Sequence, residues 1–241
     1  MYTVDVGNSS ITVGHWIGAD VVVRRFGEPA AAAEAIAGPA FLISVSADRL
    51  KLLLRAMDEQ LAQQATVLAG IPVALMDDAL AVSTGQDRLA AALAVSPGPA
   101  IVVDAGTALT VDLVDEHGTF LGGFIAPGPQ AALDGLAKAG AALPSLQQEV
   151  WEMTPGVDTA SAMGAGVWGM VVGGTDRLVQ TALARLPGAR LVVTGGWGAA
   201  WMKQSALCAQ EGGTDRDIVH DETLVHRGIA RWAQVERQLP S

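Results

Sequence analysis

The sequence has little of several residue types, and each scarcity excludes a class of protein. Its 241 residues contain one cysteine, Cys208, so neither an intrachain disulfide nor a cysteine-built metal site is possible. Lysine and arginine total 15 against 25 acidic residues, which gives a net charge of −10 at pH 7. This charge repels phosphodiester backbones and anionic lipid headgroups, so neither nucleic acid nor a membrane is expected as a partner.

Long hydrophobic runs and targeting signals are also missing. The longest apolar stretch, 163–174, is rich in glycine and too short to span a bilayer. Asp5 interrupts the N-terminus, and no basic segment precedes an apolar core of the kind that a signal peptide needs. We therefore expect a cytoplasmic protein.

Half of the residues are apolar, enough for a full core, and their spacing predicts an α/β protein. Short apolar runs bounded by turn residues predict strands at 2–6, 11–16, 21–26, 41–45, 73–76, 101–104, 109–114, 120–126 and 191–194. Apolar residues at helical spacing predict helices at 30–37, 47–64, 85–95, 129–141, 158–185, 197–207 and 222–236.

The two halves of the chain open in the same way. Val4-Asp5-Val6-Gly7 begins the first half, and Val103-Asp104-Ala105-Gly106 begins the second, 99 residues later. Each is an apolar strand that ends in Asp-x-Gly and is followed by a polar turn and another strand. With the linker Ser96-Pro97-Gly98-Pro99 between them, this repeat predicts two α/β domains, 1–97 and 98–241, with a functional cleft between the domains.

The two Asp-x-Gly turns carry the groups that bind phosphate. Backbone N–H groups of a tight turn and the hydroxyls of Ser9 and Ser10 suit phosphate oxygens, and Asp5 can hold a cation against them. Thr107 and Asp104 supply the same groups in the second turn. One such turn also fits an ordinary hairpin, but two in one chain can face each other and hold a polyphosphate.

The segment Thr84-Gly85-Gln86-Asp87-Arg88 opens a predicted helix and has two interpretations. In the structural one, Thr84 is the N-cap and Asp87 stabilises the first turn through the helix dipole. In the functional one, Asp87 accepts a proton from a substrate hydroxyl while Arg88 binds an anionic group of the same substrate. A neighbouring arginine keeps the carboxylate ionised, as a base must be.

Other segments are weaker candidates. Asp158 fits an N-cap, and Thr159 could donate to a ligand at the start of the same helix. The glycine-rich turn 193–198 fits either a nucleotide site or a plain strand-to-helix connector. The literal G-x-G-x-x-G at 164–169 follows no predicted strand, so we interpret it as tight helix packing, with Trp168 available to anchor a second copy. The four histidines lack paired ligand spacing and are expected at the surface or in packing roles.

Taken together, these residues resemble the type III pantothenate kinases, members of the actin–hexokinase–Hsp70 superfamily. The resemblance covers nearly the whole chain and is carried in order by Asp5-Val6-Gly7-Asn8, Gly85-Gln86-Asp87-Arg88, Val103-Asp104-Ala105-Gly106-Thr107-Ala108, Gly122-Gly123-Phe124-Ile125-Ala126-Pro127-Gly128 and Thr159-Ala160-Ser161-Ala162-Met163-Gly164-Ala165-Gly166. It implies two duplicated RNase H-like domains, an active site in the cleft between them, and a homodimer.

The resemblance also implies a reaction and its residues. The family uses ATP with Mg²⁺ and a monovalent cation, K⁺ or NH₄⁺, to phosphorylate pantothenate to 4'-phosphopantothenate, the first step of coenzyme A biosynthesis. It implies Asp87 as the proton acceptor and Asp104 as a ligand of the monovalent cation. The implied pantothenate ligands are Gly85, Gln86, Asp87, Arg88 and Thr159. The implied ATP ligands are Asp5, Val6, Gly7, Asn8, Ser9, Ser10, Ile11, Thr12 and Thr107.

Two positions depart from the family pattern. Ser9 replaces the usual threonine and keeps its hydroxyl, whereas Asp78 stands where members usually have a pocket-lining tyrosine. A carboxylate beside an anionic substrate is unfavourable. Two alternatives therefore stay open: a kinase of the same fold that acts on another small hydroxylated anion, and a non-catalytic nucleotide-binding or regulatory relative.

Overall fold

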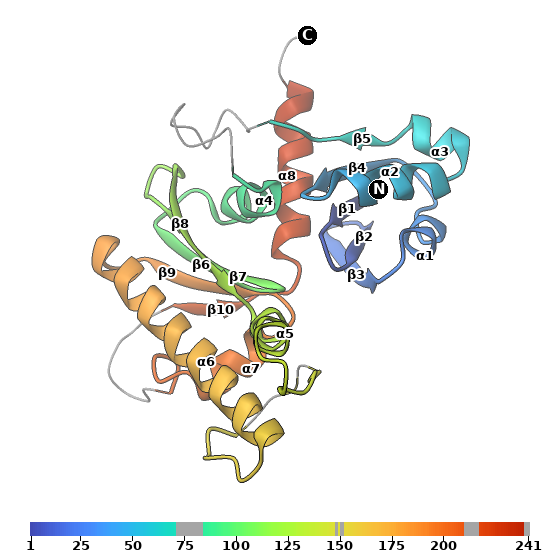
Figure 1. Cartoon of the computed structure of the whole chain (residues 1–241). Helices are drawn as coiled ribbons and strands as arrows, with labels where there is room; N and C mark the ends of the chain where they lie inside the picture. The colour runs from blue at the N-terminus through green and yellow to red at the C-terminus, as the bar shows by residue number, and fades with distance from the viewer. Residues whose placement is uncertain (71–83, 148, 150–151, 210–216, 239–241) are drawn as a thin grey trace. The chain divides into compact units, whose positions relative to one another are not determined.

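Among the residues that the structure describes, which are 1–70, 84–147, 149, 152–209 and 217–238, two five-stranded sheets organise the chain (Figure 1). In this computed structural model the strands are β1 (Tyr2–Val6), β2 (Ile11–Ile17), β3 (Asp20–Phe26), β4 (Ala40–Ser44), β5 (Thr66–Val67), β6 (Ala100–Ala105), β7 (Ala108–Val114), β8 (Phe120–Pro127), β9 (Arg190–Thr194) and β10 (Ile218–His220). The helices are α1 (Pro29–Glu34), α2 (Ala47–Ala56), α3 (Glu59–Gln63), α4 (Gln86–Val95), α5 (Pro129–Ala139), α6 (Thr159–Arg185), α7 (Gly198–Gln204) and α8 (Leu224–Gln238).

The two sheets share one strand order. The first reads β3-β2-β1-β4-β5, and the second, read from its opposite edge, is β8-β7-β6-β9-β10, so each strand has a counterpart five strands later. In the first sheet β1 is antiparallel to β2 and parallel to β4, and in the second β6 is parallel to β9. The predicted α/β class is therefore confirmed.

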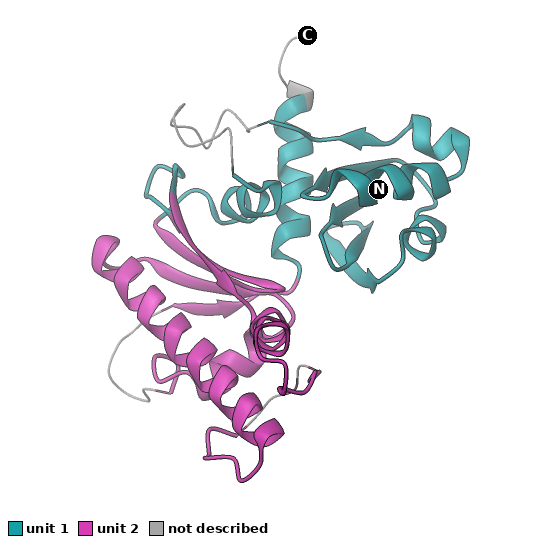
Figure 2. Ribbon diagram, viewed as in Figure 1, with its two compact units in different colours: residues 1–98, 114–121, 223–241 teal, residues 99–113, 122–222 magenta. Residues whose placement is uncertain are grey.

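The chain forms two compact units (Figure 2). Unit 1 comprises residues 1–98, 114–121 and 223–241, and unit 2 comprises residues 99–113 and 122–222. The C-terminal helix α8 thus packs with the first half of the chain. The two domains predicted from the sequence, 1–97 and 98–241, stay a prediction.

The first sheet, in unit 1, has a helix layer on each face. Val4 and Val6 of β1 and Ile11 of β2 point into a core that also contains apolar residues of α1 and α2. The opposite face carries Thr3, which contacts His226 of α8. Helix α4 packs against α8 and contacts β4, so the helix that carries Asp87 is tied to the sheet through both.

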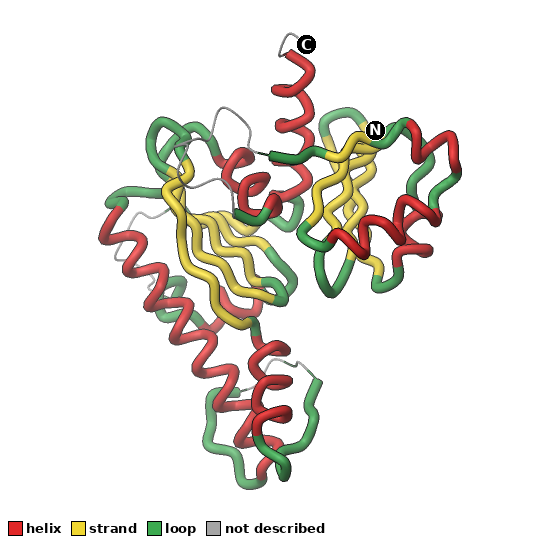
Figure 3. Tube along the Cα trace, turned by 45° about the horizontal axis from the view of Figure 1, so that its top comes forward, coloured by secondary structure: helices red, strands yellow, loops and turns green. Residues whose placement is uncertain are grey.

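In unit 2, α6 and α7 pack on the central strands of the second sheet (Figure 3). A buried carboxylate joins these helices: Asp176 of α6 accepts hydrogen bonds from Trp201 Nε1 at 3.0 Å, Ser205 Oγ at 2.7 Å and the Ala206 backbone N–H at 2.9 Å. Three donors compensate the desolvation of the charge. No helix in the described ranges is long and apolar enough to cross a bilayer.

The structure differs from the predicted elements in a few places. The single helix predicted at 47–64 is wrong, because the Asp58 side chain accepts hydrogen bonds from the backbone N–H groups of Gln60 and Leu61 and so starts a separate helix, α3. Strands β5 and β10 were not predicted, since two or three residues are too few to show alternation. The strand predicted at 73–76 lies outside the described residues.

Helices α4 and α8 meet at a glycine, which provides a test of their packing. A Cβ atom on Gly228 would collide with the backbone carbonyl of Ala90. We expect Gly228→Ala to lower the free energy of unfolding by about 1–3 kcal/mol, because overpacking forces the two helices apart. Gly173→Ala in α6 is the control: its Cβ would have no neighbour within 4 Å. Its better helix propensity should raise stability by about 0.5–1 kcal/mol. Urea unfolding measures both variants, and equal effects would contradict the close crossing.

Candidate functional site

The first Asp-x-Gly turn joins β1 to β2 and is shaped by a glycine. The Gly7 backbone N–H donates to the Ser10 carbonyl at 3.0 Å, and a Cβ on Gly7 would lie only 2.9 Å from the same oxygen. Asn8 and Ser9 are exposed at its tip, while Asp5 lies partly buried just before it. The turn therefore presents backbone and side-chain donors beside one carboxylate, a set that fits phosphate with Mg²⁺, because Mg²⁺ takes few protein ligands and completes its shell with phosphate oxygens and water.

Asp5, Thr12 and Arg25 form one row across the three-strand meander. The register pairs Asp5 with Thr12 and Thr12 with Arg25, and residues paired in this way lie on the same face of a sheet. Arg25 Nη1 donates to Ser10 Oγ at 2.9 Å. No sequence motif identifies Arg25, because only the strand register connects it to the turn.

His226 of α8 lies under the same hairpin. Its Nδ1 is 2.9 Å from Thr3 Oγ1 and its Nε2 is 3.0 Å from Thr12 Oγ1, while Trp16 Nε1 donates to Thr3 Oγ1 at 3.0 Å. Burial lowers the pKa of His226 to about 4; the hydrogen bond with Thr3 opposes this shift and the charge of Arg25 adds to it. The imidazole is therefore neutral at pH 7. The expected packing role is correct, and the contact with Thr12 adds a link to the predicted ATP ligands.

The helix that carries Asp87 begins without a side-chain cap. Helix α4 starts at Gln86, and its N-cap is Gly85, which has no side chain to accept a capping hydrogen bond. The predicted N-cap role of Thr84 is therefore wrong. Asp87 Oδ1 accepts from the backbone N–H of Arg88 at 2.8 Å, and a Cβ on residue 85 would approach that oxygen to 2.5 Å. Glycine at position 85 thus leaves room for the carboxylate.

Arg88 is positioned by an aromatic ring. Its guanidinium carbon lies 5.4 Å from the centroid of the Phe120 ring, the geometry of a cation–π contact, and Phe120 is buried. A guanidinium has five N–H donors, which match carboxylates well. Arg88 can therefore hold the anionic group of a substrate next to Asp87.

Strands β1 and β4 bring Asp5 and Asp87 to one edge of the first sheet. Val6 of β1 pairs with Ser44 of β4, and the Ser44 backbone N–H donates to Gln86 Oε1 at 3.4 Å. The carboxyl ends of parallel strands are where α/β proteins bind ligands. Unit 1 thus gathers the first turn and the uncapped start of α4 at a single edge.

The second Asp-x-Gly turn lies in unit 2 and is tighter than the first. Gly106 and Thr107 alone connect β6 to β7, and the Gly106 N–H donates to the Ala108 carbonyl at 3.2 Å. Asp104 precedes the turn, partly buried, with Oδ1 3.4 Å from the position that a Cβ on Gly106 would take. A carboxylate next to a turn rich in backbone oxygens fits a hard cation.

The third glycine turn supports the second. Trp197 Nε1 donates to the Gly106 carbonyl at 2.7 Å, and the Trp197 backbone N–H donates to the Ala105 carbonyl at 3.1 Å. A Cβ on Gly195 would lie 2.5 Å from backbone atoms of Ala105, so a glycine is required there. The turn 193–198 therefore acts as a structural connector that fixes the backbone after Asp104.

Asp158 is the N-cap of α6, as predicted. Its side chain accepts from the Ser161 backbone N–H at 2.9 Å, and its own N–H donates to Ser161 Oγ at 3.3 Å, which completes a capping box. Hydrogen bonds from Ser161 hold the pKa of Asp158 below its usual value. Thr159 is the first residue of this helix and is exposed.

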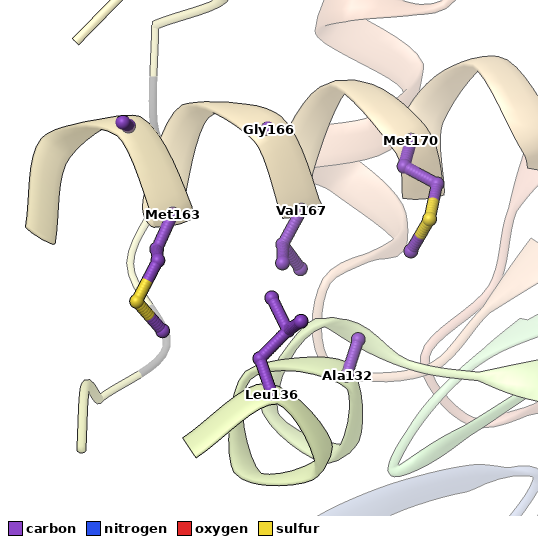
Figure 4. A pocket seen from close by; sticks show the side chains of 7 residues that line it. Ala132, Leu136, Met163, Gly166, Val167 and Met170 are labelled. Carbon is purple, nitrogen blue, oxygen red and sulfur yellow. The ribbon is translucent and has the colours of Figure 1, made fainter. Parts of the chain in front are cut away.

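An apolar groove lies between α5 and α6 (Figure 4). It has a volume of about 220 Å³ and is lined by Ala132, Leu136, Ala162, Met163, Gly166, Val167 and Met170. Helix α6 is continuous through 164–169, which confirms the helical interpretation of the literal G-x-G-x-x-G. Trp168 was expected to anchor a partner, which is wrong: it is 1% exposed and donates to Gln204 Oε1 at 2.8 Å. The exposed side chain is instead Met170, at 59%.

The predicted site residues are divided between the units. Unit 1 contains 5–12 and 85–88, and unit 2 contains Asp104, Thr107 and Thr159. Asp78 lies outside the described residues. Within the described part of the chain, no group of three or more His, Cys, Asp or Glu side chains could hold a metal ion by itself. A cation at these turns would therefore share its coordination shell with a ligand such as phosphate.

Neutral His226 makes the stability of the fold depend on pH. Its folded pKa of about 4 lies below the ordinary value of 6.5, so between these values the unfolded chain binds more protons. The free energy of unfolding should therefore fall as the pH drops from 6.5 to 4, with a contribution from His226 of up to roughly 3 kcal/mol.

His226→Gln should remove this contribution, because a glutamine amide can still contact Thr3 and Thr12 but does not titrate. Urea unfolding at several pH values between 4 and 7.5 compares the two proteins. Equal pH slopes would contradict a histidine that is buried in its neutral form.

Comparison with known proteins supports the family resemblance. A family model described as type III pantothenate kinase matches residues 26–181. The type III pantothenate kinase of Caulobacter vibrioides is 36% identical over 156 residues, which are 60% of this chain and 54% of that protein. The chain spans about half the length of the curated relatives it matches.

Solved structures share the fold along nearly the whole chain. A protein from Campylobacter jejuni, described as a Baf family transcriptional activator, has a TM-score of 0.64 at 23% identity and covers 99% of this chain and 100% of that one. A protein from Sinorhizobium meliloti, described as a 2-dehydro-3-deoxygalactonokinase, has a TM-score of 0.57 at 16% identity, with 99% of each chain covered. These likenesses show that the chain shares the fold of these two proteins. Since the family model covers more than half of its residues, this chain belongs to the type III pantothenate kinase family.

Proposed function

We propose that this protein is a pantothenate kinase, which transfers the γ-phosphoryl group of ATP to the primary hydroxyl of pantothenate and so catalyses the first step of coenzyme A biosynthesis. Family membership supports this pair of substrates. The observation that carries the proposal is the uncapped start of α4, where Asp87 stands at the sheet edge that also carries Asp5. Both substrates are cytoplasmic metabolites, and we place the protein in the cytoplasm.

In this reaction Asp87 is the general base. Its carboxylate orients the pantothenate hydroxyl and takes its proton while the oxygen attacks the γ-phosphorus in line, and ADP leaves. Gly85, Gln86 and Arg88 bind the substrate around it, and the Arg88 guanidinium meets the pantothenate carboxylate. Thr159 is a further pantothenate ligand from unit 2. Phosphoryl transfer depends mostly on positioning and electrostatics, so a rigid helix start suits the base.

ATP would bind at the two Asp-x-Gly turns, with 5–12 and Thr107 as its ligands. Magnesium, when bound, neutralises charge on the phosphates, and Asp5 is the residue that would hold it. Asp104 would hold the monovalent cation, K⁺ or NH₄⁺. The common strand order of the two sheets supports equivalent places for the turns in two duplicated RNase H-like domains, with the active site in the cleft between them.

Replacing the base gives a direct test of the reaction. We expect Asp87→Asn to lower kcat about 10²–10⁴-fold, because an amide cannot accept the proton, while the affinity for ATP stays unchanged. Asp58→Asn is the matched control, since asparagine caps a helix as well as aspartate does and Asp58 serves only the start of α3. A coupled assay of ADP release measures kcat, and calorimetry measures ATP binding. Unchanged turnover in Asp87→Asn would remove Asp87 from the mechanism.

The wild-type protein distinguishes the proposed acceptor from the alternatives. ADP release with pantothenate supports the proposal. ADP release only with another small hydroxy acid from a panel would assign a different substrate. Asp78, in place of the usual tyrosine, is the reason to test this panel. ATP binding without transfer to any acceptor would indicate a regulatory relative.

We also propose that the protein is a homodimer that associates through the face of α6 that carries Met163, Gly166 and Met170. Family membership supports a dimer, and the exposure of Met170 on the groove between α5 and α6 favours this face. A second hollow of about 450 Å³, lined in part by Met153, Pro155 and Gly169, continues the apolar surface. The exposed methionines on this surface, Met170 and Met153, favour an interface here.

A charge on this face should separate the subunits. We expect Met170→Glu to convert the dimer to a monomer, because two carboxylates would be buried against apolar surface. Val22→Glu is the control, since Val22 is similarly exposed, at 55%, but lies on β3 of unit 1. Light scattering coupled to size exclusion gives the mass of each variant. A monomeric wild type would refute the proposal.

A further inference from the structure

We infer that Arg25 is a further phosphate-binding residue, which supplies the positive charge that ATP requires at the first Asp-x-Gly turn. The inference rests on the proposed kinase function. The nine predicted ATP ligands include one carboxylate and no cationic side chain. Phosphoryl-transfer sites regularly place arginine or lysine on the phosphates, because polyphosphate is highly charged. The site as predicted from motifs therefore lacks a group that its ligand needs.

The strand register places Arg25 where that group belongs. Arg25 pairs with Thr12, which in turn pairs with Asp5, so the two charged residues share a face of the sheet two strands apart. The spacing of neighbouring strands puts their backbones about 10 Å apart. The carboxylate and the guanidinium therefore lie on either side of Thr12, which is itself a predicted ATP ligand.

The guanidinium is already directed toward the turn. Arg25 Nη1 donates to Ser10 Oγ at 2.9 Å, and the side chain is otherwise exposed. Arginine carries five donors in a planar fork that binds phosphate in a bidentate manner, so one bond to Ser10 leaves donors for a ligand. Ser10 belongs to the same turn, so this bond holds the Arg25 guanidinium at the turn.

Neither of the two neighbouring basic residues, His226 and Arg24, supplies a positive charge on the face of β3 that carries Arg25. His226, which lies beneath Thr12, is neutral at pH 7 and adds no positive charge. Arg24 pairs with Val13, whose side chain belongs to the apolar core, so Arg24 lies on the opposite face of β3 from Arg25. Its guanidinium carbon lies 5.0 Å from the centroid of the Phe26 ring. Two adjacent arginines therefore differ in the face on which they lie, which provides an internal control.

Calorimetry of nucleotide binding tests the inference. We expect Arg25→Met to weaken MgATP and MgADP binding about 10–100-fold, as loss of a charge-assisted contact does, and to leave adenosine binding unchanged. Arg24→Met should bind MgATP, MgADP and adenosine like the wild type. Arg25→Lys should recover part of the lost affinity, since it restores the charge without the fork. Thermal unfolding of each variant checks that the fold is intact.

Two results would overturn the inference: equal MgATP affinity in Arg25→Met and the wild type, or equal weakening in Arg24→Met and Arg25→Met. A wild type that binds no MgATP would overturn it as well. The binding test of Arg25 can be distinguished from the activity test of the proposed reaction. A protein that binds MgATP through Arg25 but does not phosphorylate pantothenate would support the inference and refute the acceptor.

Discussion

The register of β1 with its two neighbours is the constraint on which the candidate site depends. It places Asp5 opposite Thr12 on one side and Ile43 on the other, and it aligns Val6 with Ser44, whose N–H reaches Gln86 at the start of α4. A slip of one residue would turn Asp5 into the core and Val6 to the opposite face. The buried valines of β1 therefore set the position of the carboxylate, although they never touch a ligand.

The C-terminal helix α8 stabilises this register within unit 1. Helix α8 packs against α4 and the first sheet, and His226 joins β1 to β2 through its contacts with Thr3 and Thr12. Because the histidine is neutral, it holds the hairpin without opposing the charge of Arg25. Unit 2 supports its own Asp-x-Gly turn in a different way, through the Trp197 indole on the Gly106 carbonyl. The two turns thus have similar sequences but separate means of support.

Much of this arrangement could be predicted from the sequence, and the exceptions have physical reasons. Apolar periodicity located the longer strands and helices, and the repeated Asp-x-Gly turns matched two sheets of equal strand order. Local propensity favoured Thr84 as an N-cap, but the fold starts α4 at Gly85 and leaves Asp87 beside an uncapped helix start. Arg25 could not be predicted, because it reaches the turn only through its pairing with Thr12 and its hydrogen bond to Ser10, 15 residues earlier. The sequence also favoured Trp168 as an exposed anchor, but Trp168 is buried and contacts Trp197 and Gln204.

A crystal structure with pantothenate and a non-hydrolysable MgATP analogue tests the account most directly, because it shows where each carboxylate lies relative to the reacting atoms. We expect a pantothenate hydroxyl within about 3 Å of an Asp87 oxygen. We also expect the terminal phosphate on the turn between β1 and β2, close to Asp5. Phosphates bound away from that turn, or an Asp87 carboxylate that points away from the hydroxyl, would contradict it.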